Sequence, residues 1–192
     1  MPIVLPDMAG SLNTLTRETI LKALQALSDE LAQRQVTGEL CLFGGTVMVL
    51  AFAARPSTKD VDAIFQPTQM IRAAARQIAA SNNLPETWLN DAAKGSVSAR
   101  HETITGSLPQ FPHLRLTMPT PEYLLAMKCM ASRIGSMAGE ADDVTDILFL
   151  IRHLKLATAA AVMDIVAAYY PKNQIPVKAQ YLVEGLFAEG KV

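Results

Sequence analysis

The pattern of apolar and polar positions along the chain alternates between helical and strand spacing. Residues 16–35 carry apolar side chains at i, i+3 and i+4 positions, which is the spacing of an amphipathic helix. Two further helices are expected at 46–54 and 69–80. Short apolar runs bounded by turn residues predict strands at 39–43, 60–65 and 114–118.

After residue 118 the pattern becomes entirely helical. Thr120 suits the N-cap of a helix and Pro121 its first position. Further helices are expected at 142–154, 158–169 and 177–189. We therefore predict an α/β core with a small mixed sheet over residues 1–118, followed by a helical C-terminal bundle over residues 119–192.

The composition is that of a globular protein. Half of the 192 residues are apolar and only 18% are charged, which excludes a disordered chain. The length suits one domain, or one domain with a helical extension. The net charge of −1 gives no overall basic signature of a nucleic-acid-binding protein, although a local basic patch would suffice for RNA.

The cysteines and the N-terminus bear on location. Cys41 and Cys129 lie in elements predicted to be buried, and we expect core thiols in a reducing cytoplasm. No Cys/His cluster has zinc spacing. The N-terminus lacks the basic start and long apolar core of a signal peptide. The apolar run 40–54 is interrupted by Gly-Gly and too short for a span of about 20 residues, so we expect a cytoplasmic protein without membrane partners.

Asp60 and Asp62 alternate on the predicted strand 60–65. Because strand side chains alternate, both carboxylates leave from one face. Burying neighbouring acids without a partner is costly, and a divalent cation such as Mg²⁺ or Mn²⁺ removes this cost, since hard cations prefer oxygen ligands. The alternative is that the acids cap a neighbouring helix or pair with Arg55 and Lys59.

A Gly-Gly turn precedes this strand. Gly44 and Gly45 allow the backbone to approach a ligand closely and to adopt positive φ. The helix beginning at Thr46 directs its N-terminal amides at such a ligand, as in anion-binding sites. Phosphate-binding amides and metal-binding acids in one strand–helix–strand unit predict a metal-dependent enzyme acting on a nucleotide.

These residues carry a family resemblance. Phe43-Gly-Gly-Thr46, followed by Arg55-Pro-Ser-Thr-Lys-Asp-Val-Asp62, resembles the nucleotidyltransferase superfamily, which has the polymerase-beta-like fold. The residues of this motif are similar to those of the minimal bacterial members. These include the nucleotidyltransferase toxins of type IV toxin–antitoxin systems and a related uncharacterised subgroup.

The resemblance raises the question of a third carboxylate, which polymerase-beta-like enzymes often place on a later strand. Asp91, in the segment Trp88-Leu-Asn-Asp91, and Glu102 are the two candidates. Asn90 and Asp91 could equally cap the following turn. Both interpretations are therefore open.

A second motif follows in the helical part. Lys128 and Arg133, a short loop, then Asp143 and Asp146 resemble the Lys…Arg…Asp-x-x-Asp motif of the toxin family. The match implies that Lys128 binds the triphosphate and that Asp146, with Asp143 beside it, orients Lys128 or Arg133 or joins the site. The chain departs from the motif at Asp142, where a basic residue is expected. The alternative is a structural ion pair between two helices.

The resemblance implies a Mg²⁺-dependent transfer of NMP from an NTP to an acceptor hydroxyl. In that case Asp60 and Asp62 hold the metal, and Gly44, Gly45 and Thr46 cradle the phosphates. The acceptor would be a tRNA or a protein, or alternatively a small molecule such as an aminoglycoside, and a toxin would have an antitoxin partner. The competing hypothesis is a catalytically silent module that binds a nucleotide or a partner.

Overall fold

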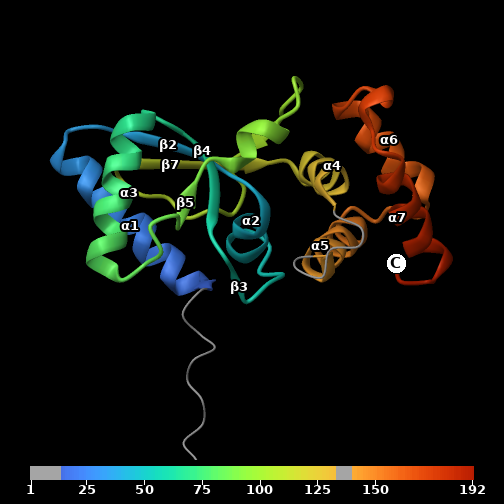
Figure 1. Cartoon of the computed structure of the whole chain (residues 1–192), viewed down its shortest axis with the longest axis horizontal. Helices are drawn as coiled ribbons and strands as arrows, with labels where there is room; N and C mark the ends of the chain where they lie inside the picture. Colours follow the sequence, from blue (N-terminus) through green and yellow to red (C-terminus); the bar gives the residue numbers. More distant parts are fainter. Residues whose placement is uncertain (1–13, 133–139) are drawn as a thin grey trace, which may run out of the picture.

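The computed structural model describes residues 14–132 and 140–192 (Figure 1). Within these ranges the chain is mixed α/β, with seven α-helices, a five-stranded mixed sheet and a two-stranded sheet. Figure 1 shows helices α1 (Arg17–Gln33) and α3 (Thr68–Asn82) at one end of the molecule. The C-terminal helices lie at the other end, with the main sheet between. The mixed α/β class predicted from periodicity is thus confirmed.

The main sheet has the strand order β5-β4-β2-β7-β6. Its centre is β2 (Gly38–Leu42), which pairs antiparallel with β4 (Val61–Gln66) and parallel with β7 (Leu114–Pro119). At one edge, β5 (Leu89–Asn90) runs parallel to β4, and at the other β6 (Thr103–Ile104) runs antiparallel to β7. The three predicted strands are the three central ones.

The central strands bury alternate residues, as a sheet covered on one face requires. The fully covered positions pack in the core with α1 and α3 and include Leu40, Phe65 and Leu116. The opposite positions are partly exposed and include Cys41. Cys41 is therefore a partly buried thiol packed against the core rather than a fully buried one, whereas Cys129 is buried.

Helix α2 (Gly44–Leu50) is displaced from the expected range 46–54. It begins directly at the Gly-Gly turn, and a second small sheet of β1 (Leu15–Thr16) and β3 (Ser57–Thr58) lies close by. The Arg17 guanidinium donates to the last helical carbonyls, those of Val49 at 3.1 Å and Leu50 at 2.6 Å. This distant cap satisfies carbonyls that a longer helix would have bonded internally.

The remaining helices follow the sheet. They are α4 (Pro121–Ala131), α5 (Glu140–His153), α6 (Ala159–Tyr169) and α7 (Val177–Ala188), with the short 3₁₀ segments η1 (Ala92–Ser96) and η2 (Lys172–Gln174). Helix α4 packs against α5, α6 and α7. The Thr120 hydroxyl accepts from the Tyr123 amide at 3.3 Å, which confirms the predicted N-cap. The change from sheet to helices falls at the boundary predicted near residue 119, and the division into two units stays a prediction.

In the parts of the chain that the structure describes, none of the helices has both the length and the apolar character needed to span a bilayer. Helix α1 illustrates why. It has 17 residues but is amphipathic, burying Ile20, Leu24, Leu27 and Leu31 on one side. Its opposite side carries charged residues such as Glu18 and Lys22, which form a solvent-exposed ion pair.

Candidate active site

Two acids lie at the start of β4, on the sheet face that α1 and α3 leave open. Asp62 shares that face with Ile64 in the alternating burial pattern of the strand. Asp60 directly precedes the strand. Burial raises the pKa of both carboxyl groups, and the negative charge of Asp60 raises the pKa of Asp62 further. This effect of Asp60 on Asp62 is the one expected of neighbouring acids, in agreement with their alternate spacing along the chain.

A third polar group joins them from the edge strand. The side-chain amide of Asn90 on β5 donates to Asp60 Oδ2 at 3.0 Å. The β4–β5 register pairs Asp62 with Asn90, and hydrogen bonding to Asn90 lowers the pKa of both acids against the larger effect of burial. Asn90 was considered only as a turn cap. The apolar pair Trp88-Leu89 before it is compatible with a strand but too short to establish a strand period.

The two carboxylates proposed as the third acid have other partners. Asp91 lies 2.5 Å from Arg72 Nη2 and 2.6 Å from Lys94 Nζ. Glu102 binds Arg100 at 2.8 Å and accepts from the Tyr169 hydroxyl at 3.0 Å. Neither carboxylate joins Asp60 and Asp62, and no group of three or more His, Cys, Asp or Glu residues that could hold a metal occurs within the described residues.

The two glycines of the turn have different neighbours. Gly44 has φ +57°, and a Cβ atom added there would lie 3.2 Å from Asp62 Oδ2. A Cβ atom on Gly45 would overlap Thr58 Oγ1 and lie 2.8 Å from Arg55 Nη1. Gly44 therefore makes room for an acid of the site, whereas Gly45 makes room for structural side chains rather than for a ligand.

Thr46 was expected to bind phosphates through its backbone amide, which stays a prediction, and its side chain has a separate structural role. It is fully buried, and its hydroxyl donates to the Asp60 carbonyl at 3.1 Å. The Phe43 amide donates to the Asp62 carbonyl at 2.8 Å. These two bonds fix the Gly-Gly turn against the acidic strand, so the Thr46 side chain positions the site instead of facing it.

The predicted lysine and acids of the second motif form a partly buried ion-pair cluster. Lys128 Nζ lies 2.7 Å from Asp146 Oδ2 and 3.0 Å from Asp143 Oδ1. Arg55 Nε lies 3.4 Å from Asp146 Oδ1, and the Asp146 side chain is only 1% exposed. Burial raises the pKa of Asp146, while Lys128 and Arg55 lower it. The ion pairs place α4, α5 and the loop after α2 around one point.

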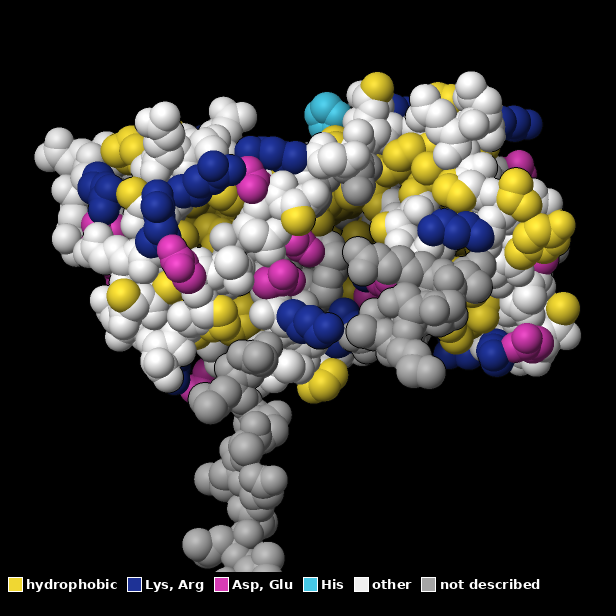
Figure 2. Space-filling model, viewed as in Figure 1, with side chains coloured by type: hydrophobic (Ala, Val, Ile, Leu, Met, Phe, Trp, Pro, Cys, Tyr) yellow, Lys and Arg dark blue, Asp and Glu magenta, His cyan; other side chains and the backbone are white. Residues whose placement is uncertain are grey.

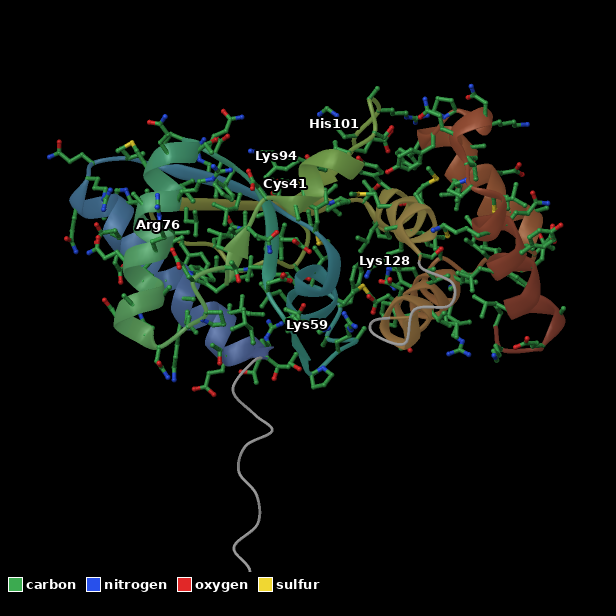
Figure 3. The ribbon with its side chains drawn as sticks, in the orientation of Figure 1. Cys41, Lys59, Arg76, Lys94, His101 and Lys128 are labelled. Atoms are coloured by element: carbon green, nitrogen blue, oxygen red, sulfur yellow. The ribbon has the colours of Figure 1, made fainter. Side chains whose placement is uncertain are left out.

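Lys128 also faces the acids of β4. Its charge lowers the pKa of Asp62, and a pocket of about 250 Å³ is lined by Gly44, Asp62, Lys128 and Asp143. Figure 3 shows Lys128 reaching from α4 into the space between α2 and α5. Figure 2 shows acidic side chains at the centre of this face, beside Lys and Arg side chains. The two motifs, more than 60 residues apart in sequence, therefore meet at one pocket.

The remaining basic residues considered for the site have different outcomes. Arg133 lies outside the described residues. Arg55, considered as a partner of the β4 acids, binds Asp146 instead. Lys59 acts on Asp60 through its charge, lowering the pKa of that acid. The Lys128–Asp146 pair is present, as both the catalytic and the structural interpretation of the motif require.

The donor set of the pocket suits a hard divalent cation. Asp62, which lines the pocket, and the neighbouring Asp60 offer carboxylate oxygens, and burial raises the pKa of each acid more than the charges of Lys128 and Lys59 lower it. Mg²⁺ is typically bound through one or two carboxylates together with water and substrate phosphates. Two acids beside an open pocket fit that mode, with the other ligands left to water and substrate.

Comparison with known proteins found no protein-family model, no curated protein and no solved structure that matches this chain.

Proposed function

We propose that the chain is a Mg²⁺-dependent nucleotidyltransferase with a polymerase-beta-like core, moving NMP from an NTP to an acceptor hydroxyl in the cytoplasm. The observation that carries this proposal is the meeting of Asp62 and Lys128 at one pocket. Two close acids and a lysine serve the two needs of phosphoryl transfer, which are cation binding and neutralisation of charge on the phosphates. The family resemblance supports the same assignment.

In this proposal Asp60 and Asp62 hold the cation. Mg²⁺ or Mn²⁺, when bound, would offset phosphate charge and lower the pKa of the acceptor hydroxyl. Asn90 positions Asp60 by donating to Oδ2, which leaves Asp60 Oδ1 for a ligand. Gly44 presents its backbone to the pocket without a side chain and keeps the phosphate role assigned to the turn.

Lys128 binds the β- and γ-phosphates of the NTP and stabilises the pyrophosphate that leaves. An ammonium group has three donors, and two of them are directed to Asp143 and Asp146. The third is left for a phosphate oxygen. Asp146, held by Arg55 as well, positions Lys128 rather than contacting substrate.

The acceptor follows from the resemblance. A tRNA or a protein hydroxyl is the acceptor in the toxin interpretation, which also implies a cognate antitoxin protein as partner. A small molecule such as an aminoglycoside is the alternative acceptor.

A second candidate function is a silent module that binds a nucleotide or a partner. The engagement of Asp91 with Arg72 and Lys94, and of Glu102 with Arg100, favours it, because neither supplies a third acid. The enzyme and the nucleotide-binding form of this module share nucleotide binding and differ in the transfer of NMP.

Calorimetric titration of each NTP with and without Mg²⁺ tests the proposal. The proteins are the wild type, the double variant Asp60→Asn/Asp62→Asn, and Asp164→Asn as a matched control at an exposed aspartate of α6. We expect Mg²⁺-dependent binding that the double variant loses and the control keeps. Incubation with labelled NTP and candidate acceptors then follows.

Label transfer by the wild type supports the enzyme, and binding without transfer to any acceptor class supports the silent module. Failure of every NTP to bind the folded wild type contradicts the autonomous enzyme and the nucleotide-binding module, and leaves a module that binds a partner. Circular dichroism and thermal unfolding of each variant separate a lost site from a lost fold.

A further inference from the structure

A second cavity of about 430 Å³ lies beside the candidate active site. We call it the uncharged pocket, and its lining includes Val97, Ser98, Met130, Ala131, Tyr170 and Gln174. These residues come from the segment after η1, from the end of α4 and from the segment after α6. Figure 1 shows η1 and α6 on either side of α4, which forms the boundary between them. The volume of the uncharged pocket lies within the usual range of small-molecule sites.

The uncharged pocket adjoins the candidate active site. Ala131, at the end of α4, lines both cavities. The η1 segment also borders both, through Ala92 on the side of the acids and Gly95 on the other side. A ligand that lies along α4 and η1 can therefore occupy the two cavities at once.

The two cavities have opposite chemistry. The candidate active site contains Asp62, Lys128 and Asp143. The described lining of the uncharged pocket includes no Asp, Glu, Lys or Arg side chain. Because unpaired charge is costly to desolvate, this lining suits a neutral group rather than a phosphate. The walls formed by Val97 and Met130 are apolar, as binding of a flat ring requires.

The side chain of Gln174 is placed to form hydrogen bonds with such a ring. Gln174 lines the pocket and its side-chain amide engages none of the described residues, while its backbone amide donates to the Pro171 carbonyl at 2.8 Å. A carboxamide carries both donors and an acceptor, which can match the hydrogen-bonding edge of a nucleobase.

The walls of the pocket are held before a ligand arrives. The Ser98 hydroxyl donates to the Tyr169 carbonyl, and the Ser98 amide donates to the Tyr123 hydroxyl at 2.8 Å. The Tyr123 and Tyr169 rings stack with centroids 4.8 Å apart, and the Arg100 guanidinium lies 5.4 Å from the Tyr169 centroid. A wall built in advance lowers the ordering cost of binding.

We propose that the uncharged pocket binds a nucleobase, with Gln174 contacting its polar edge, while the phosphates of the same reaction lie at Lys128. This inference rests on the proposed function. The base belongs either to the NTP or to an acceptor nucleoside, and both share the chemistry of a neutral heteroaromatic ring.

Calorimetry with ligands that lack one half of a nucleotide tests the assignment. The probes are the four NTPs with Mg²⁺, inorganic tripolyphosphate with Mg²⁺, and the four ribonucleosides. The variant Ala99→Trp fills the uncharged pocket from an exposed lining position, and Ala157→Trp adds the same side chain at an exposed loop position outside both cavities.

We expect at least one nucleoside to bind the wild type and Ala157→Trp, and Ala99→Trp to weaken that binding at least fivefold, the scale of one stacked base. Tripolyphosphate affinity should stay unchanged in Ala99→Trp. Absence of nucleoside binding to the wild type overturns the inference, as does equal nucleoside affinity in Ala99→Trp. The wild type could also bind a nucleoside but no triphosphate, with the nucleoside affinity weakened in Ala99→Trp. That result would support the nucleobase pocket and contradict the proposed transferase.

Two further measurements refine the result. The first is nucleoside binding in the presence of saturating NTP. If NTP blocks nucleoside binding, the pocket holds the base of the NTP. If the nucleoside still binds, the pocket holds the base of the acceptor. Gln174→Leu, nearly the same size without the amide, should reduce the affinity differences among the four nucleosides. Unchanged differences in this variant overturn the role of Gln174.

Discussion

The side-chain amide of Asn90 donates to Asp60 Oδ2 at 3.0 Å, from a strand that runs parallel to the acidic one. A neutral amide thus contacts the acid pair where the resemblance led us to expect a third carboxylate. The pair of acids keeps a charge of −2 rather than −3 near Lys128. Asn90 therefore tunes how strongly the site attracts a cation.

Replacing Asn90 by Asp should make stability depend more on divalent cations. In the presence of EDTA the variant loses the bond to Asp60 and gains a repelling charge, and we expect about 1.5–3 kcal/mol of destabilisation. Added Mg²⁺ should restore more stability to the variant than to the wild type, because binding to the native state stabilises it by mass action. Urea unfolding with EDTA or Mg²⁺ measures both effects.

Asn90→Ala is the control for this experiment, since it removes the bond without adding charge. Mg²⁺ should stabilise it no more than it stabilises the wild type. An equal Mg²⁺ response in all three proteins would show that position 90 does not adjoin a cation site.

Asp91 should contribute stability that depends on pH. Hydrogen bonds from Lys94 and Arg72 lower the pKa of this acid below its usual value of 3.8. An acid with a lowered native pKa stabilises the fold above its unfolded pKa, and the contribution disappears as pH falls through the native value. Asp91→Asn should therefore be less stable than the wild type at pH 7, and the difference should vanish under acidic conditions.

Urea unfolding at several pH values between neutrality and the acid limit of the folded state provides the measurement. Asp164→Asn, at an exposed aspartate of α6, serves as the comparison. A difference between Asp91→Asn and wild type that is the same at every pH would contradict the linkage.

The elements that the sequence predicted well bury their own apolar faces. Leu40, Phe65 and Leu116 alternate with less buried residues, and so the central strands match their expected ranges within one residue. The two-residue strands β5 and β6 were not predicted. A two-residue element has no period, and its existence depends on a partner strand elsewhere in the chain.

Some residues of the candidate site could likewise be predicted from the sequence, and others could not. Asp62 and Lys128 were each predicted from a short motif and line one pocket, with Asp60 close to Asp62 and Asp146 paired with Lys128. The choice between Asn90 and Asp91 was not predictable, because neighbouring residues of an extended segment point in opposite directions. A register set by β5 pairing with β4 directs Asn90 to Asp60, and Asp91 contacts Arg72 instead.

The glycines at 45 and 185 should respond in opposite ways to alanine. A Cβ atom on Gly45 would overlap Thr58 Oγ1 and crowd Arg55 Nη1 at 2.8 Å, and overpacking of this kind costs about 1–3 kcal/mol. Gly185 lies inside α7 with nothing within 4 Å of an added Cβ atom. Gly185→Ala should gain about 0.5–1 kcal/mol, since alanine favours the helix.

Urea unfolding of both single variants measures the two effects. Gly45→Ala should also weaken NTP binding, because it displaces the Arg55 side chain that holds Asp146. Equal stability of Gly45→Ala and wild type would indicate that the turn has room for a side chain.

Lys128 should stabilise the fold through its partly buried ion pair with Asp146. Lys128→Met removes the nearer cation from Asp146, whose side chain is 1% exposed, and leaves Arg55 at 3.4 Å. Breaking a buried pair on one side costs about 3 kcal/mol, so the urea midpoint should fall clearly. Lys22→Met is the matched control, because the Lys22–Glu18 pair is 75% exposed on both sides and solvent screens its contribution to stability.

The double variant Lys128→Met/Asp146→Asn separates an ion-pair effect from a loss of packing. It removes the buried negative charge along with its partner, and we expect it to recover most of the stability lost in Lys128→Met. A cost of Lys128→Met no greater than that of Lys22→Met would contradict a stabilising buried pair between Lys128 and Asp146. Asp143, 3.0 Å from Lys128 Nζ, would then be the partner that holds the lysine at the pocket.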